Sequence, residues 1–369
     1  VTNTLAPART TLHIVNDSGA QLPGVTYVIR DAKRNIVTVG GTVLFTSAAQ
    51  AMTIVGDLPD GQYYLSEVNA PNGYLPAADV PFTVETGKAT EATAVNRRAA
   101  GTRSANVSIQ VYEGEHLLYA QDTTTGAYAK KGVYTRYAAL FADAARTQKV
   151  SNVQTITLNG FAGSTVFRYL DDGTVYYVAE TDQYGTALSK GNNYEIRYTD
   201  KGQFTAGRQT AQRIIQEIYS SLPEGFRYTA RLTVEKRVTD HDKKAKAVTD
   251  TFYVGVFRNS DYSDTPTILT FEMNQTSSSV VSRRILLPES GTITYYFAEV
   301  DKNGKRVTET PGFQYIPTFE NNSITLTKSS EMTNVLVNRE KISNVTFYLT
   351  KRVYEGTTQK KTTGTFYAG

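Results

Sequence analysis

The sequence predicts an all-β protein made of tandem immunoglobulin-like β-sandwich domains arranged end to end. One phrase is written three times, as Tyr63–Val68, Tyr176–Thr181 and Tyr295–Val300, each time after a turn that contains glycine. Aromatic and aliphatic residues alternate with the others at period two in every copy, which is typical of a β-strand. The 369 residues include 25 Tyr and 15 Phe but no Trp, and this composition also favours strands. The wide spacing of the copies indicates repeated domains rather than a solenoid.

Each copy of the phrase carries a glutamate at the same place: Glu67, Glu180 and Glu299. Residues two apart on a strand lie on one face, so each glutamate shares its face with an apolar residue two positions earlier. If that face is the core, every domain buries a carboxylic acid. Because a lone buried carboxylate is expensive, a thrice-repeated one is expected to have partners or a chemical task.

The chain divides by these repeats into three domains and the start of a fourth. Small polar residues at Arg97–Ser104 suit a linker, and the motif Lys236–Val238 returns as Lys351–Val353 after the third domain. Two strands do not hold a core alone, so we expect the natural chain to continue beyond Gly369. Thr210–Tyr219 fits a short amphipathic helix, but the repeat predicts a strand there. The predicted domains are 1–100, 101–224 with a long first loop, 225–342 and 343–369.

Composition excludes several classes of function. The net charge is +4 and the basic residues are scattered, so the run Lys243–Lys246 is interpreted as a solvated loop and no nucleic-acid partner is expected. Zero cysteines exclude disulfides and thiolate metal sites. The histidines His13, His116 and His241 lack ligand-like spacing, so neither a metal nor another cofactor is expected. No apolar run reaches the roughly 20 residues that cross a bilayer, and no motif of an enzyme with an external substrate is present.

The third domain offers a lysine in its first strand, a glutamate in its middle and an asparagine in its last strand: Lys236, Glu299 and Asn338. Together with the Tyr-Tyr-x-x-Glu strands and the run Leu58–Tyr74, these residues resemble the Cna-B-type, isopeptide-forming domains of Gram-positive pilins and cell-wall-anchored surface adhesins. The resemblance covers all three domains and the final fragment. It implies a spontaneous bond between Lys236 and Asn338, with Glu299 as the acid/base.

Elementary chemistry supports that implication. A lysine desolvated in an apolar core loses its proton and becomes a nucleophile, and a glutamate kept neutral by burial can polarise the asparagine carbonyl and move protons. Fixed geometry then allows a slow amide exchange to proceed once. This is a single-turnover event and does not make the protein an enzyme. An unreacted buried pair of Lys236 and Glu299 is the alternative.

The other domains depart from the pattern. Domain one keeps Glu67 and Asn96, but Ile14 stands at the lysine position. Neither domain one nor domain two is expected to form the lysine–asparagine bond, and their acids are interpreted as vestigial or alternative groups.

Domain two keeps Glu180, but Ile109 and Gln216 stand at the positions that match the lysine and the asparagine. A Thr–Gln ester bond at Gln216 is an alternative for this domain. In the fourth domain, Lys351 would be the crosslink donor.

These observations predict an extracellular structural stalk or pilin-like subunit on the Gram-positive cell wall, with neighbouring pilin or surface-protein domains as partners. A Tyr-Pro-Lys-type pilin motif is missing, which counts against a shaft role. The alternative is a ligand-binding adhesin module, in which domain one or two recognises a host protein or glycan. Exposed tyrosines at Tyr119–Tyr137, around the long loop His116–Thr135, would favour it; buried ones would not.

Overall fold

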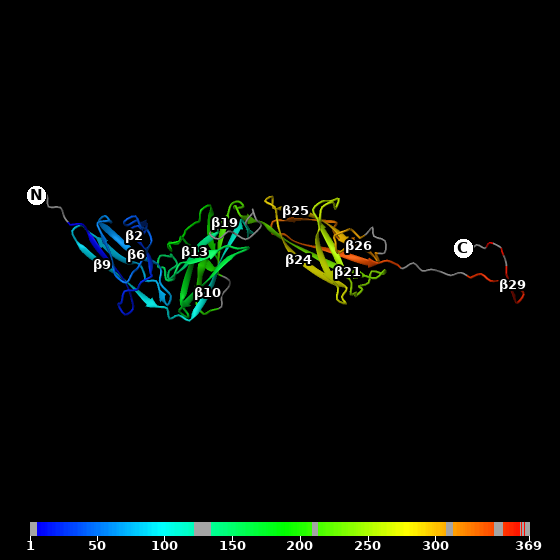
Figure 1. The fold of residues 1–369 in the computed structure, drawn as a ribbon, viewed down its shortest axis with the longest axis horizontal. Coiled ribbons are helices and arrows are strands. Elements are labelled where there is room, and N and C mark those ends of the chain that lie inside the picture. Colours follow the sequence, from blue (N-terminus) through cyan, green and yellow to red (C-terminus); the bar gives the residue numbers. More distant parts are fainter. Residues whose placement is uncertain are drawn as a thin grey trace. The chain divides into compact units, whose positions relative to one another are not determined.

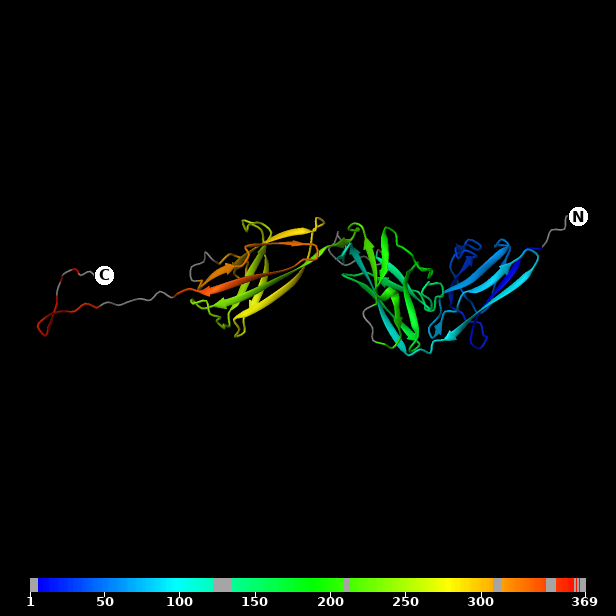
Figure 2. The same ribbon diagram turned by 180° about the vertical axis from the view of Figure 1, so that it is seen from behind.

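The protein, described from a computed structural model, is a tandem array of β-sandwiches, and the predicted all-β fold class is confirmed. Residues 6–121, 134–208, 213–307, 313–342, 350–361, 363 and 365 are described. Within these ranges the single helical element is a short 3-10 turn, η1 (Thr199–Gly202). Figures 1 and 2 draw the sandwiches in sequence colours, from blue through green to orange.

The first sandwich is formed by β1 (Arg9–Asn16), β2 (Thr26–Asp31), β3 (Ile36–Val37), β4 (Phe45–Thr46), β5 (Met52–Val55), β6 (Gly61–Asn69), β7 (Tyr74–Leu75), β8 (Val80–Val84) and β9 (Ala89–Arg98). One sheet has the order β5-β1-β9-β7 and the other β3-β2-β6-β8, with β4 paired to β2. Leu12 and Ile14 of the first sheet share a buried cluster with Tyr27 and Leu65 of the second. The core therefore lies between the two sheets.

The second sandwich is formed by β10 (Arg103–Glu113), β11 (His116–Leu117), β12 (Tyr119–Ala120), β13 (Thr135–Phe141), β14 (Gln154–Thr157), β15 (Gly163–Leu170), β16 (Val175–Thr181), β17 (Tyr194–Tyr198), β18 (Gln203–Thr205), β19 (Arg213–Tyr219) and β20 (Phe226–Arg227). Its sheets are β11-β10-β19-β17, with β15 beside β10, and β14-β13-β16-β18; β12 pairs with β20. The strand predicted near the end of this domain is present as β19, while residues 210–212 lie outside the described ranges.

The third sandwich is formed by β21 (Thr229–Thr239), β22 (Thr251–Phe257), β23 (Thr267–Glu272), β24 (Ser278–Leu286), β25 (Thr292–Val300), β26 (Tyr315–Phe319), β27 (Ser323–Thr327) and β28 (Glu331–Glu340). Its sheets have the orders β24-β21-β28-β26 and β23-β22-β25-β27. After it, β29 (Val353–Glu355) and β30 (Thr358–Lys360) form a two-stranded hairpin.

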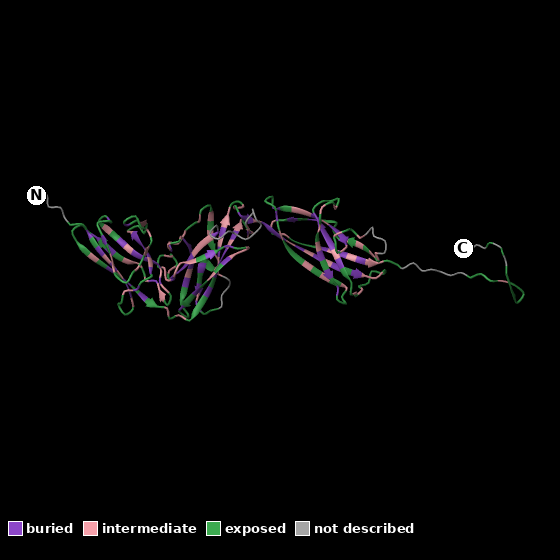
Figure 3. Cartoon of the chain, in the orientation of Figure 1, coloured by how far each residue is buried: buried purple, intermediate pink, exposed green. Residues whose placement is uncertain are grey.

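The opening and closing strands of each sandwich are neighbours in one sheet: β1 with β9, β10 with β19, and β21 with β28. β1 and β9 run parallel, as do β10 and β19. Buried residues alternate with less buried ones along β9 and β28, because successive side chains of a strand point to opposite faces. The same alternation of purple with pink or green is visible in Figure 3. Opening and closing strands therefore present neighbouring side chains to one core.

By internal contacts the residues form two compact units. The first contains 1–232, 284–293 and 325–331, and the second contains 233–283, 294–324 and 332–369. Lys236, Glu299 and Asn338 all belong to the second unit. In the described ranges no helix is long and apolar enough to cross a membrane.

Candidate crosslinking site in the third domain

Three polar side chains from three strands lie in the core of the third sandwich. Lys236 comes from β21, Glu299 from the end of β25 and Asn338 from β28, and their exposed fractions are 0%, 1% and 0%. The strand alternation explains their position: Lys236 lies between Val234 and Val238 on the buried face of β21. The sheets thus bring together all three residues that the sequence predicted for this site.

The carboxyl group of Glu299 contacts both of the other groups. Lys236 Nζ donates a hydrogen bond to Glu299 Oε2 at 2.6 Å, and Asn338 Nδ2 donates to Glu299 Oε1 at 3.0 Å. The Lys236 amine also lies 4.9 Å from the centre of the Phe252 ring. Asn338 Oδ1 is buried and has no hydrogen-bond partner among the described residues. An amine, an amide and an acid are therefore held in contact in an apolar surrounding.

Burial shifts both titratable groups toward their neutral forms. Desolvation lowers the pKa of Lys236 to about 8, although the Glu299 carboxylate opposes this shift. Desolvation also raises the pKa of Glu299, against the opposing effects of Lys236 and Asn338. Moving one proton from the ammonium to the carboxylate neutralises both groups, so burial makes this transfer easier than it is in water. An uncharged amine is a nucleophile, and the acid can donate and accept protons.

Domain one contains an acid–amide pair with no amine hydrogen-bonded to it, although the positive charge of Lys149, from domain two, also acts on its acid. Asn96 Nδ2 donates to Glu67 Oε2 at 2.6 Å and to the Leu75 carbonyl at 3.0 Å, and the Ala77 amide donates to the same Glu67 oxygen at 2.9 Å. Glu67 and Asn96 are 2% and 0% exposed. Desolvation raises the pKa of Glu67, while the hydrogen bonds from Ala77 and Asn96 act in the opposite direction. Ile14 contributes no polar atom to this site.

Domain two departs from the sequence prediction in the residue that faces Glu180. Gln216 is only half-buried, whereas the next residue, Glu217, is fully buried. The register gives the reason: Tyr194 pairs with Tyr219, two residues after Glu217, just as Tyr315 pairs with the residue two after Asn338. The assignment of Gln216 to the asparagine position was therefore wrong by one residue.

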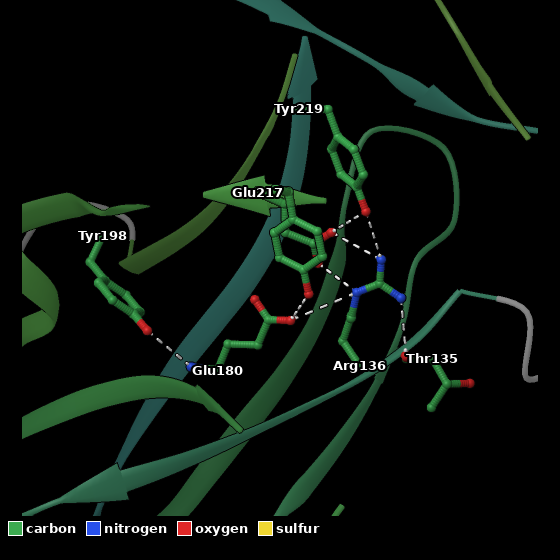
Figure 4. Close-up of polar contacts among 7 residues, drawn as sticks. Thr135, Arg136, Glu180, Tyr198, Glu217 and Tyr219 are labelled. Atoms are coloured by element: carbon green, nitrogen blue, oxygen red, sulfur yellow. Dashed lines mark hydrogen bonds and ion pairs between the residues drawn. The ribbon is translucent and has the colours of Figure 1, made fainter. Parts of the chain in front are cut away.

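Arg136 of β13 holds the two buried acids of domain two. Its Nε and a terminal nitrogen bind Glu217 Oε1 at 2.7 Å and Oε2 at 3.0 Å, and Nε lies 3.8 Å from Glu180 Oε1. Tyr194 donates its hydroxyl to Glu180, and Arg136 also donates to the Tyr219 hydroxyl at 3.3 Å. Figure 4 shows dashed contacts that run from the Arg136 guanidinium to both carboxylates. Two acids thus share one cation.

The excess of acid over cation determines the protonation of this cluster. Burial, followed by the negative charge of Glu217, raises the pKa of Glu180 to about 7. Burial also raises the pKa of Glu217, but the direct hydrogen bonds and charge of Arg136 counteract it. Glu217 is therefore the ionised partner of Arg136, and Glu180 is the acid that takes up a proton first.

Arg136, Glu217, Tyr194 and Tyr219 were not predicted from the sequence. For Glu217 a signal existed, because it lies two residues after the apolar Ile215 on an alternating strand. For Arg136 the sequence held no signal. Comparison of the repeats leads to the first strand of each domain, where Lys236 lies in domain three, whereas Arg136 lies on the second strand of its domain.

The remaining predicted residues take no part in these clusters. Lys351 is exposed and lies before the β29–β30 hairpin, outside any described strand. In the part of the chain that the structure describes, no group of three or more His, Asp or Glu residues is placed to hold a metal ion. Of the long loop in domain two, residues 122–133 lie outside the described ranges.

One family model matches the first domain. Residues 10–98 match the family model described as SpaA, a prealbumin-like fold domain. For these residues the match agrees with the predicted β-sandwich fold. No curated protein sequence matches the chain.

Several solved structures, two major pilins among them, align with the chain. The Bacillus anthracis TIE protein aligns at 12% identity over 90% of this chain, which spans 51% of that protein, with a TM-score of 0.21. The major pilin subunit BcpA of Bacillus cereus aligns at 10% identity over 91% of this chain and 100% of its own, with a TM-score of 0.23. The full-length major pilin SpaD of Corynebacterium diphtheriae aligns at 11% identity over 91% and 98%, with a TM-score of 0.20.

Proposed function

We propose that this chain is an extracellular structural stalk, a pilin-like part of a Gram-positive surface protein, stabilised by an autocatalytic isopeptide bond between Lys236 and Asn338. The observation that carries the proposal is the buried contact of Glu299 with both the amine and the amide. The SpaA match of residues 10–98 supports a pilin-type setting. The proposed location is the cell surface or cell wall, with neighbouring pilin or surface-protein domains as partners.

The proposed reaction is an amide exchange in which atoms balance. A proton moves from the Lys236 ammonium to Glu299, and the neutral amine attacks the side-chain carbonyl carbon of Asn338. The acid polarises that carbonyl once the amide turns its oxygen toward it; amide oxygen and nitrogen have nearly the same shape, so the turn needs little space. The new C–N bond replaces the bond to the amide nitrogen, Glu299 relays a proton to it, and ammonia leaves. The amine is consumed, so each domain reacts once.

The bond would connect the opening and closing strands of the domain. β21 and β28 are neighbours in one sheet, and the chain enters and leaves the sandwich through them. Tension applied at the ends of the domain would otherwise load the hydrogen bonds of these strands. A covalent link between Lys236 and Asn338 would carry that load instead, which suits a protein that holds another module away from a cell. The division at 1–100, 101–224, 225–342 and 343–369 is part of this proposal.

Of the tyrosines in the segment Tyr119–Tyr137, Tyr128 lies outside the described residues and the described ones are buried or half-buried, so they give the ligand-binding alternative no support. Tyr134 is buried and its ring lies 4.9 Å from that of Phe226. Tyr119 is half-buried and packs edge-on against Phe161 at 4.8 Å. Both side chains are used for packing, so neither presents an exposed aromatic surface to a host protein or glycan.

The intact mass of the folded chain tests the proposal. Loss of one ammonia lowers the mass by about 17 Da relative to the composition, and Glu299→Ala should restore the full mass because the proton relay is removed. Gln314→Ala, in a segment that contributes no side chain to the site, is the matched control and should keep the deficit. A wild-type chain at full mass would contradict the proposal.

A further inference from the structure

Domain one reproduces the acceptor side of the crosslinking site. In both domains a buried asparagine on the closing strand donates its side-chain amide to a buried glutamate. The distance is 2.6 Å for Asn96 and Glu67, and 3.0 Å for Asn338 and Glu299. In both, the asparagine oxygen is buried without a hydrogen-bond partner among the described residues. The amide that would be attacked and the acid that would assist are therefore already in contact.

The second oxygen of the acid distinguishes the two domains. Glu299 Oε2 accepts a hydrogen bond from Lys236, but Glu67 Oε1 is buried and has no hydrogen-bond partner in the part of the chain that the structure describes. A buried polar atom without a partner costs free energy, so this oxygen is a ready acceptor for an amine.

The strand register shows which residue stands where that amine would come from. The Arg9 amide donates to the Lys88 carbonyl at 3.0 Å, and the Arg231 amide donates to the Ser330 carbonyl at 2.8 Å. These two bonds are equivalent first rungs between the opening and closing strands. On the closing strands, Asn96 lies as far beyond Lys88 as Asn338 lies beyond Ser330. On the opening strands, Ile14 lies as far beyond Arg9 as Lys236 lies beyond Arg231, so Ile14 occupies the position of the lysine.

Ile14 fits the donor position in burial as well as in register. It is 3% exposed and belongs to the core cluster of the first sandwich, together with Leu65, which lies two residues before Glu67 on β6. Its side chain therefore points into the same core as the acid and the amide. What domain one lacks, compared with domain three, is a nitrogen at this position.

We infer that domain one holds a complete acceptor for amide exchange, and that it does not react because Ile14 occupies the donor position, while the Lys149 amine is hydrogen-bonded to the Val68 and Ser151 carbonyls instead. The inference rests on the proposed function, because it transfers the reaction of domain three to domain one. An amine placed at position 14 would give up its proton to Glu67, attack the side-chain carbonyl carbon of Asn96, form a new C–N bond and release ammonia. The residue at the donor position then determines which domains of the stalk are covalently closed.

Intact-mass measurement of the full chain carrying Ile14→Lys tests the inference. We expect an additional deficit of about 17 Da beyond that of the wild-type chain, one further ammonia. Glu67→Ala in the same variant should abolish the additional deficit. Leu12→Lys is the register control: Leu12 lies two residues earlier on the same buried face, so its amine would not meet the acid and amide and no additional mass should be lost.

The two proposals fail in different ways. A deficit in the wild-type chain with none added by a folded Ile14→Lys variant would overturn the inference and leave the bond of domain three intact. A wild-type chain at full mass overturns the proposed function, whereas a deficit in Ile14→Lys alone would still establish the acceptor of domain one.

A second route covers the case in which a buried lysine prevents folding. The chain has no cysteine, so Ile14→Cys introduces its single thiol. Alkylation of that thiol with 2-bromoethylamine in denaturant adds an amine at lysine length, and refolding then allows the reaction. We expect the mass of the alkylated chain to fall by about 17 Da on refolding and to stay unchanged while the chain is kept in denaturant. An alkylated protein whose mass does not change on refolding would overturn the inference.

Discussion

Replacing Lys236 by methionine should destabilise the third domain strongly. Methionine has a similar length and volume, so the variant removes the amine while keeping the core filled. It also leaves Glu299 buried without its cation, which adds to the cost of losing the bond. The proposed bond closes a loop from position 236 to position 338. For a loop of about 100 residues, loss of the crosslink returns about 4.7 kcal/mol of chain entropy to the unfolded state at 25 °C.

This loss corresponds to a large shift in melting temperature. Strands β21 to β28 span a domain of about 110 residues, which unfolds with an entropy of about 0.23 kcal/mol per kelvin. The third-domain transition of Lys236→Met should therefore lie about 20 °C below that of the wild type in scanning calorimetry. Lys246→Met is the matched control: this lysine pairs with Glu340 at 2.6 Å, and both side chains are about a third exposed. Its loss should cost no more than about 1 kcal/mol.

The reasoning would be refuted by a Lys236→Met chain whose third-domain transition stays within about 5 °C of the wild type, since the entropy of a closed loop would then be absent. A similar shift in Lys246→Met would also refute it, because the effect would then belong to any lysine of the domain.

Two further predictions concern the buried cluster of domain two. The raised pKa of Glu180, about 7 in the folded domain, means that folding takes up a proton, so this stabilisation is present at low pH and lost as the pH rises through 7. Urea unfolding should show domain two losing up to about 3 kcal/mol between pH 5 and pH 8, and Glu180→Gln should remove the slope; an unchanged slope would contradict the assignment. Arg136→Met leaves Glu217 buried without its cation and should cost about 3–5 kcal/mol. Arg197→Met, which removes an exposed pair, should cost no more than about 1 kcal/mol in the same assay, and equal losses would show that burial of the guanidinium has no special effect.

The sequence was sufficient to locate the site of domain three because its chemistry follows the strand period. Alternation placed Glu67, Glu180 and Glu299 on the apolar side of their strands, and the structure buries all three. Lys236 and Asn338 were found because they occupy the opening and closing strands, which repeat in recognisable form.

The cluster of domain two was not predictable by the same reasoning. Gln216 resembles asparagine chemically, and this similarity drew the alignment away from Glu217; because side chains alternate across a strand, a slip of one residue moves the assignment from the core to the opposite face. Arg136 follows a long loop and reaches the acids from a strand that carries no equivalent group in the other domains. Contacts between non-equivalent strands depend on the packing of the two sheets, which a comparison of repeats does not contain.

Peptide mapping of the denatured, trypsin-digested chain tests the central claim most directly. A bond at Lys236 blocks cleavage after that residue, so the account predicts one branched peptide that joins 232–237 to 329–339, with a mass about 17 Da below the sum of its two parts. The same digest of Glu299→Ala should yield cleavage after Lys236 and the two parts as separate peptides. Separate, unmodified peptides from the wild-type chain would contradict the crosslink and, with it, the proposed stalk held closed by a covalent bond.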